Sequence, residues 1–84
     1  MKLKEEVIIA PNDDESIMVD ASGNFKGMVK LNETASFIAS LFYEDISEEE
    51  AVEKLIQEYD CDVDEAKEAV KYTISKIKEA GLFQ

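Results

Sequence analysis

The sequence has 84 residues, 45% of them apolar, which is enough to build the core of one small domain over residues 1–84. Twenty Asp and Glu oppose nine lysines, with no Arg or His, for a net charge of −11; this opposes nucleic-acid binding and removes the commonest general base and metal ligand. No apolar run could cross a membrane, and a single cysteine without a secretion signal leads us to expect a cytoplasmic protein.

Three apolar stretches in the first third of the sequence predict β-strands. They are EEVIIA at 5–10, SIMVDA at 16–21 and FKGMVKL at 25–31, with turn-forming residues between them. Strands so close in sequence favour antiparallel pairing. In the third stretch the side chains alternate between two faces, one with Lys26, Met28 and Lys30 and the other with Phe25, Gly27, Val29 and Leu31.

The rest of the sequence predicts three helices. Asn32 is a candidate N-cap for the first, and Ser47 with Glu50 forms a capping box before the second. Asp62 with Glu65 is a similar box before the third, and Gly81 suits the position after its C-terminus. The predicted fold is therefore α+β, a three-stranded antiparallel sheet followed by a three-helix bundle, and it is winged helix-turn-helix-like.

Catalysis and metal binding find little support in the residue pattern. Asp60, Asp62 and Asp64 begin like a calcium loop, but Glu65 and Lys71 replace the glycine and the final glutamate that such a loop needs. Cys61 lies between two acids, a neighbourhood unfavourable to a reactive cysteine, and has no histidine to activate it. We therefore expect no enzyme, no metal and no cofactor.

Lysines gather on two of the predicted elements. Lys67, Lys71, Ile74 and Lys78 fall within one arc of the third helix, and Lys26 and Lys30 share a face of the third strand. One interpretation is a solvated helix face with Glu–Lys pairs. The other is a lysine-bordered groove between the third strand and the third helix, where an extended peptide adds to an exposed strand edge.

Two stretches, LNETASFIASLF at 31–42 and ISEEEAVEKLIQEYDCDVDEAKEAVKYTISKIKEAGLF at 46–83, resemble the protein D family of pyrroloquinoline quinone biosynthesis. The resemblance implies a recognition element that binds the leader of a ribosomally made precursor peptide beside the third strand. A modifying enzyme, often a radical S-adenosylmethionine enzyme, then acts on the peptide. The implied peptide-binding residues are Lys26, Gly27, Met28, Val29, Lys30 and Leu31 on the strand, and Lys67, Val70, Lys71, Ile74 and Lys78 on the helix.

The sequence departs from the family pattern at two places. Ala39 replaces a tryptophan found in many members, and Glu44-Asp45 replaces a glycine-containing turn, so the product of the pathway is not fixed by the resemblance. Two other functions remain open from the sequence, a winged-helix DNA-binding regulator and an acidic carrier protein. The chain is expected to be a monomer or a dimer, with no nucleic-acid or membrane partner if the peptide-binding interpretation holds.

Overall fold

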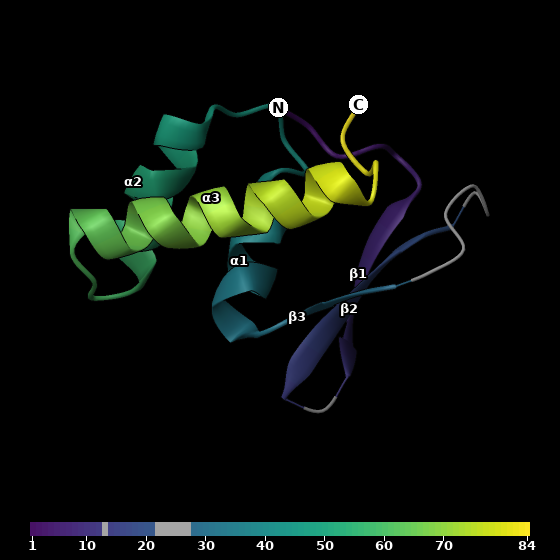
Figure 1. The fold of residues 1–84 in the computed structure, drawn as a ribbon, viewed down its shortest axis with the longest axis horizontal. Coiled ribbons are helices and arrows are strands. Elements are labelled where there is room, and N and C mark those ends of the chain that lie inside the picture. The colour runs from purple at the N-terminus through teal and green to yellow at the C-terminus, as the bar shows by residue number, and fades with distance from the viewer. Residues whose placement is uncertain (13, 22–27) are drawn as a thin grey trace.

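The computed structural model describes residues 1–12, 14–21 and 28–84 and contains the predicted order of elements (Figure 1). Strands β1 (Val7–Asn12), β2 (Glu15–Asp20) and β3 (Val29–Leu31) form an antiparallel sheet in the order β1-β2-β3. Helices α1 (Glu33–Leu41), α2 (Glu48–Glu58) and α3 (Val63–Glu79) follow. The prediction of an α+β fold with three strands followed by three helices is confirmed; its winged-helix character stays a prediction.

Local capping explains where the helices begin. The Asn32 side chain accepts a hydrogen bond from the Ala35 amide at 2.8 Å, so α1 starts directly after β3. Ser47 and Glu50 form the predicted capping box of α2. For α3 the structure confirms the cap itself, because the Asp62 carboxylate accepts from the Glu65 amide at 2.8 Å.

The three helices pack on one another, and α1 joins them to the sheet. In Figure 1 the long α3 lies across α1 and α2, and α1 also contacts β2 and β3. The largest fully buried side chains come from the sheet, all three helices and both chain ends; they are Phe42, Leu3, Met18, Leu31, Ile38, Leu55, Ile77, Leu82, Val70 and Thr73. Burial of this apolar area is the main favourable term in folding.

The two ends of the chain lie side by side, as Figure 1 shows. Leu3 forms a β-bridge with Phe83, and the Lys4 amide donates to the Leu82 carbonyl at 2.9 Å. Gly81 has a φ of 69°, the left-handed conformation expected of a C-terminal cap, and this turn directs Leu82 back into the core. The N-terminal segment is thereby held between the C-terminus and the α1–α2 connection, where the Leu3 amide donates to the Phe42 carbonyl at 2.8 Å.

Within the described part of the chain, no helix combines the length and the apolar character needed to cross a bilayer.

Candidate functional site

The sheet has two edges, and its register shows which backbone groups point outward from each. The Ala21 amide donates to the Glu6 carbonyl at 2.8 Å, in line with the β1–β2 register. Because hydrogen-bonded and non-bonded pairs alternate in an antiparallel ladder, the amides of Val7, Ile9 and Pro11 would face away from β2. The same alternation on the other side of β2 leaves the amide and carbonyl of Lys30 facing outward from β3.

None of the three outward-facing positions of β1, Val7, Ile9 and Pro11, offers a free backbone amide. The Val7 amide donates to the Lys4 carbonyl at 3.1 Å, and the Ile9 amide donates to the Tyr43 hydroxyl at 3.0 Å. Pro11 has no amide hydrogen to offer, which is how proline is tolerated in edge strands. A strand added at the β1 edge would therefore find carbonyl acceptors on β1 but no free amide donors.

The β3 edge is open by comparison. β3 pairs with β2 through Val29 and Leu31, and the outward amide and carbonyl of Lys30 bond to no other residue that the structure describes. The β3 strand therefore presents the unpaired backbone groups that another extended chain requires.

A groove runs between this edge and the C-terminal end of α3. It has a volume of about 270 Å³ and is lined by Met28, Val29, Lys30, Lys76, Glu79 and Ala80. The ammonium of Lys76 lies 5.2 Å from the centre of the Tyr72 ring, a cation–π contact on the exposed side of α3. Neither Lys30 nor Lys76 forms an ion pair with a described carboxylate. The groove thus has apolar residues in its lining and two lysines at its border that pair with no described carboxylate.

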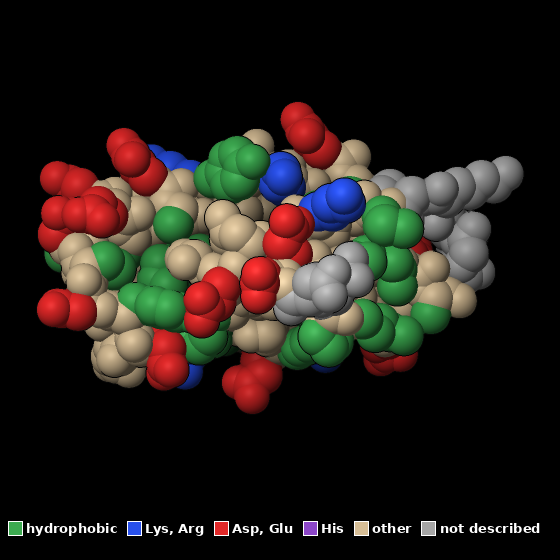
Figure 2. Space-filling view, turned by 90° about the horizontal axis from the view of Figure 1, so that it is seen from below, with side chains coloured by type: hydrophobic (Ala, Val, Ile, Leu, Met, Phe, Trp, Pro, Cys, Tyr) green, Lys and Arg blue, Asp and Glu red, His purple; other side chains and the backbone are tan. Residues whose placement is uncertain are grey.

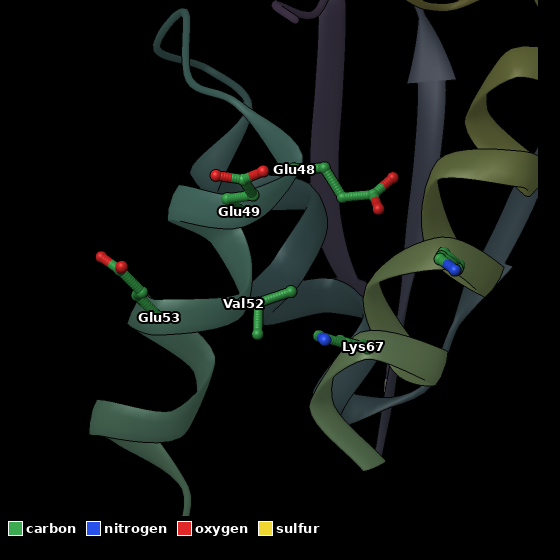
Figure 3. Close-up of a pocket in the computed structure, with 6 residues that line it drawn as sticks. Glu48, Glu49, Val52, Glu53 and Lys67 are labelled. Atoms are coloured by element: carbon green, nitrogen blue, oxygen red, sulfur yellow. The ribbon is translucent and has the colours of Figure 1, made fainter. Parts of the chain in front are cut away.

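A second cleft, of about 460 Å³, lies between α2 and α3 (Figure 3). In the close-up, Glu48 extends from α2 toward α3 and Lys67 extends toward Val52, whereas Glu53 points away. The cleft is rimmed by charges of both signs and is separate from β3. Across the described ranges, no group of three or more His, Cys, Asp or Glu side chains is placed to hold a metal ion.

A third hollow, near the start of α3, holds the only cysteine of the chain. Cys61 is half-buried and lies with Tyr59, Leu55 and Ala69 around a space of about 250 Å³. Burial raises the pKa of Tyr59, and the nearby carboxylates of Glu33 and Glu58 raise it further. This environment keeps the phenol protonated at neutral pH, so it is suited to packing rather than to proton transfer.

Comparison with known proteins identifies the family. The family described as Coenzyme PQQ synthesis protein D (PqqD) matches residues 5–82. The chain belongs to the PqqD family. No curated protein matches the sequence.

Two solved structures share the fold of this PqqD-family chain. TbiB1 in complex with the TbiA(beta) leader peptide has a TM-score of 0.78 and 24% identity, covering 100% of this chain and 95% of TbiB1. Lasso peptide synthetase B1 complexed with the leader peptide has a TM-score of 0.72 and 22% identity, covering 96% and 93% of the respective chains.

The structure places only some of the residues predicted for this PqqD-family site at the β3 groove. On the strand side, Met28, Val29 and Lys30 line the groove, Leu31 is buried in the core, and Lys26 and Gly27 lie outside the described residues. Their role in binding remains a prediction.

On the helix side, the predicted residues do not lie at the β3 groove. Lys67 and Lys71 line the α2–α3 cleft, and Val70 and Ile74 are buried in the core. Lys78 is exposed and is not among the residues that line the groove. The expected lysine-bordered groove between β3 and α3 therefore has a different helix side, made of Lys76, Glu79 and Ala80.

The reason is the orientation of α3. At 100° per residue, Lys67, Lys71 and Lys78 lie on one flank of the buried stripe, and Ala69, Lys76 and Ala80 lie on the other. The helix packs with the second flank toward β3. The small side chain of Ala80, at the end of that flank, was the one signal in the sequence that a backbone could approach there.

Proposed function

We propose that this PqqD-family domain binds the leader of a ribosomally made precursor peptide as an added strand on the open edge of β3. The observation that carries the proposal is the contrast between the two sheet edges. The donors of β1 are occupied or absent, whereas Lys30 presents an outward amide and carbonyl beside a groove. In strand addition the main chain supplies affinity and alternate side chains enter the groove to supply specificity.

The comparison with solved structures also supports a peptide as the ligand. Two solved structures that share this fold, TbiB1 and lasso peptide synthetase B1, were determined with leader peptides. The binding residues that we propose are Met28, Val29 and Lys30 on the strand side and Lys76, Glu79 and Ala80 on the helix side, with Lys26 and Gly27 retained from the sequence.

The proposed domain acts by proximity and catalyses nothing itself. A bound leader holds the attached core peptide near a docked modifying enzyme, at an effective concentration of about the millimolar scale for a short flexible linker. A radical S-adenosylmethionine enzyme is the proposed partner, on the strength of the family resemblance. We propose that the domain works in the cytoplasm, without a nucleic-acid or membrane partner.

Electrostatics favours a peptide over DNA as the ligand. Acidic side chains crowd the left end of the face shown in Figure 2, where Figure 1 places α2 and the start of α3. The first turn of α3 carries Asp64 and Glu65 directly after Asp62. A helix that begins this way repels phosphates, which supply most of the affinity in protein–DNA contacts.

The proposal is tested by titrating the ¹⁵N-labelled full chain with synthetic candidate leader peptides. We expect the amide shifts to concentrate at Met28 to Leu31 and at Lys76, Glu79 and Ala80, with slowed hydrogen exchange at the Lys30 amide. Lys30→Pro removes that amide as Pro11 does in β1, and it should weaken binding, whereas Lys30→Gln keeps the amide and serves as its matched control. Shifts spread evenly over the three helices with β3 silent would contradict strand addition.

A further inference from the structure

The residues around the β3 groove specify which side chains a bound strand must carry. We infer that the peptide presents an acidic side chain opposite Lys30 and, next to it in sequence, an apolar side chain opposite Val29 that fills the groove against α3. This inference rests on the proposed function and assigns the chemistry of its ligand.

Strand geometry fixes the two directions. Side chains of directly paired residues on adjacent strands lie on the same face of a sheet. Val29 pairs with the fully buried Met18 and therefore belongs to the face that packs against the helices. Lys30 pairs with Ile17 and belongs to the opposite face. A guest residue opposite Val29 would point toward α3, and its neighbour opposite Lys30 would point the other way.

The groove accepts an apolar side chain on its helix side. Val29 is half-buried and Ala80 faces it across a space of about 270 Å³, so a small aliphatic floor lies between β3 and α3. Lys76 and Glu79 stand at the rim with opposite charges. An aliphatic side chain inserted here removes apolar surface from water, at a gain proportional to the area covered.

Charge favours an acid at the adjacent position. Lys30 is the charged side chain of β3 on the sheet face away from α3, so it sets the local charge that the adjacent guest residue would meet there. Lys30 is exposed and forms no ion pair with a described residue. A carboxylate opposite it gains a cross-strand pair, and a lysine there would face a like charge.

Selection from a displayed library tests the inference. The full chain is used to select binders from a randomised seven-residue segment held in a flexible flanking sequence, and the consensus is then synthesised with Glu or Lys at each position. We expect adjacent apolar and acidic positions, and a preference for Glu over Lys of about fivefold in Kd, because an attractive pair is exchanged for a repulsive one.

Charge reversal identifies the protein partner of that acid. Lys30→Glu should reverse the preference at the acidic position and leave the apolar position unchanged, and Lys30→Gln should abolish it. Lys54→Glu changes the total charge equally on an exposed site of α2, so it should preserve the preference. Binders with no acidic preference, or with one that Lys30→Glu leaves intact, would overturn the inference but not peptide binding. Failure to select any binder would overturn both.

Discussion

At the scale of single residues, Asn32 joins the candidate site to the helical core. It directly follows β3, has extended backbone angles of −73° and 178°, and accepts the Ala35 amide at 2.8 Å. The cap satisfies an amide of the first helical turn that would otherwise lack a partner. The same residue therefore begins α1 and fixes where β3 ends.

Replacing Asn32 should destabilise the domain through this cap. Asn32→Ala is expected to lower the free energy of unfolding by about 1 kcal/mol, the usual cost of removing a polar N-cap. Asn32→Asp keeps an accepting oxygen and is the matched control. Urea unfolding followed by circular dichroism measures both. Equal stability of the Ala variant and the wild type would show that the hydrogen bond contributes nothing.

Asp62 and Glu65, at the start of α3, should titrate apart. The Glu65 amide donates to Asp62 and lowers the pKa of that carboxyl, while the hydrogen bond between the two side chains raises the pKa of Glu65. The lowered pKa of Asp62 stabilises the fold at pH values above the pKa of Asp in the unfolded chain, and this contribution is lost as the pH falls through the folded-state pKa. The raised pKa of Glu65 stabilises the fold at pH values below the pKa of Glu in the unfolded chain, and this contribution is lost as the pH rises through the folded-state pKa. The two effects oppose each other, so the pair should give little net pH dependence of stability.

Carbon-detected NMR titration resolves the two groups. We expect the pKa of Asp62 to lie below and that of Glu65 above the ordinary value of each carboxyl, and Asp62→Asn to bring the pKa of Glu65 back toward its ordinary value, because it weakens the hydrogen bond between the two side chains and removes the neighbouring charge. A Glu65 titration that is unchanged in Asp62→Asn would contradict the assigned cause.

At the scale of elements, the two edges of the sheet differ in whether their outward-facing amides already have a hydrogen-bond partner. Tyr43 reaches from the α1–α2 connection to the Ile9 amide, and Pro11 removes the next outward donor of β1. At Lys30 of β3 the outward amide is present and donates to no other described residue. A protected edge and an open edge in one small sheet would direct a guest strand to β3 and limit pairing between copies of the chain through β1.

Opening the β1 edge should therefore promote self-association. Tyr43→Phe frees the Ile9 amide and Pro11→Val restores a donor, and each added intermolecular hydrogen bond should raise the association constant by about fivefold. Sedimentation velocity of the two single variants and the double variant measures this against the wild type. A double variant that associates no more than the wild type would show that these residues do not guard the edge.

The sequence predicted local features of the elements better than their placement. The Ser47–Glu50 box, the Asp62 cap and the Gly81 turn depend on residues within a few positions of each other, and all three were predicted. The flank of α3 that lines the β3 groove could not be chosen from the sequence, because both flanks carry lysines and the choice depends on how α3 packs across α1; the peptide-binding role of Lys67, Val70, Lys71, Ile74 and Lys78 stays a prediction. The role of Tyr43 was not foreseen, since its contact with Ile9 joins residues far apart in the sequence.

At the scale of the whole molecule, an excess of acidic charge acts on the folded state. The net charge is −11, and the one ion pair found within the described ranges joins the N-terminal ammonium to Asp45 at 3.0 Å. Repulsion among solvated carboxylates is therefore offset by few specific contacts. Such repulsion destabilises a compact state and is screened by salt.

Salt should accordingly stabilise the domain. Raising sodium chloride from about 0.01 M to about 0.2 M shortens the Debye length from about 30 Å to below about 10 Å, and the midpoint of thermal unfolding should rise by a few degrees. Differential scanning calorimetry at fixed pH measures the change. A midpoint that falls with salt would show that attractive pairs outweigh the repulsion.

The central claim is that a leader peptide pairs through its backbone with the outward groups of Lys30. Methylating the leader's amide nitrogens one at a time, and measuring the Kd of each peptide for the full chain, tests it most directly. Strand addition predicts losses of about tenfold or more at every second residue across the contact, with little effect at the residues between, because alternate amides point away from β3. Losses that show no two-residue period would contradict the claim.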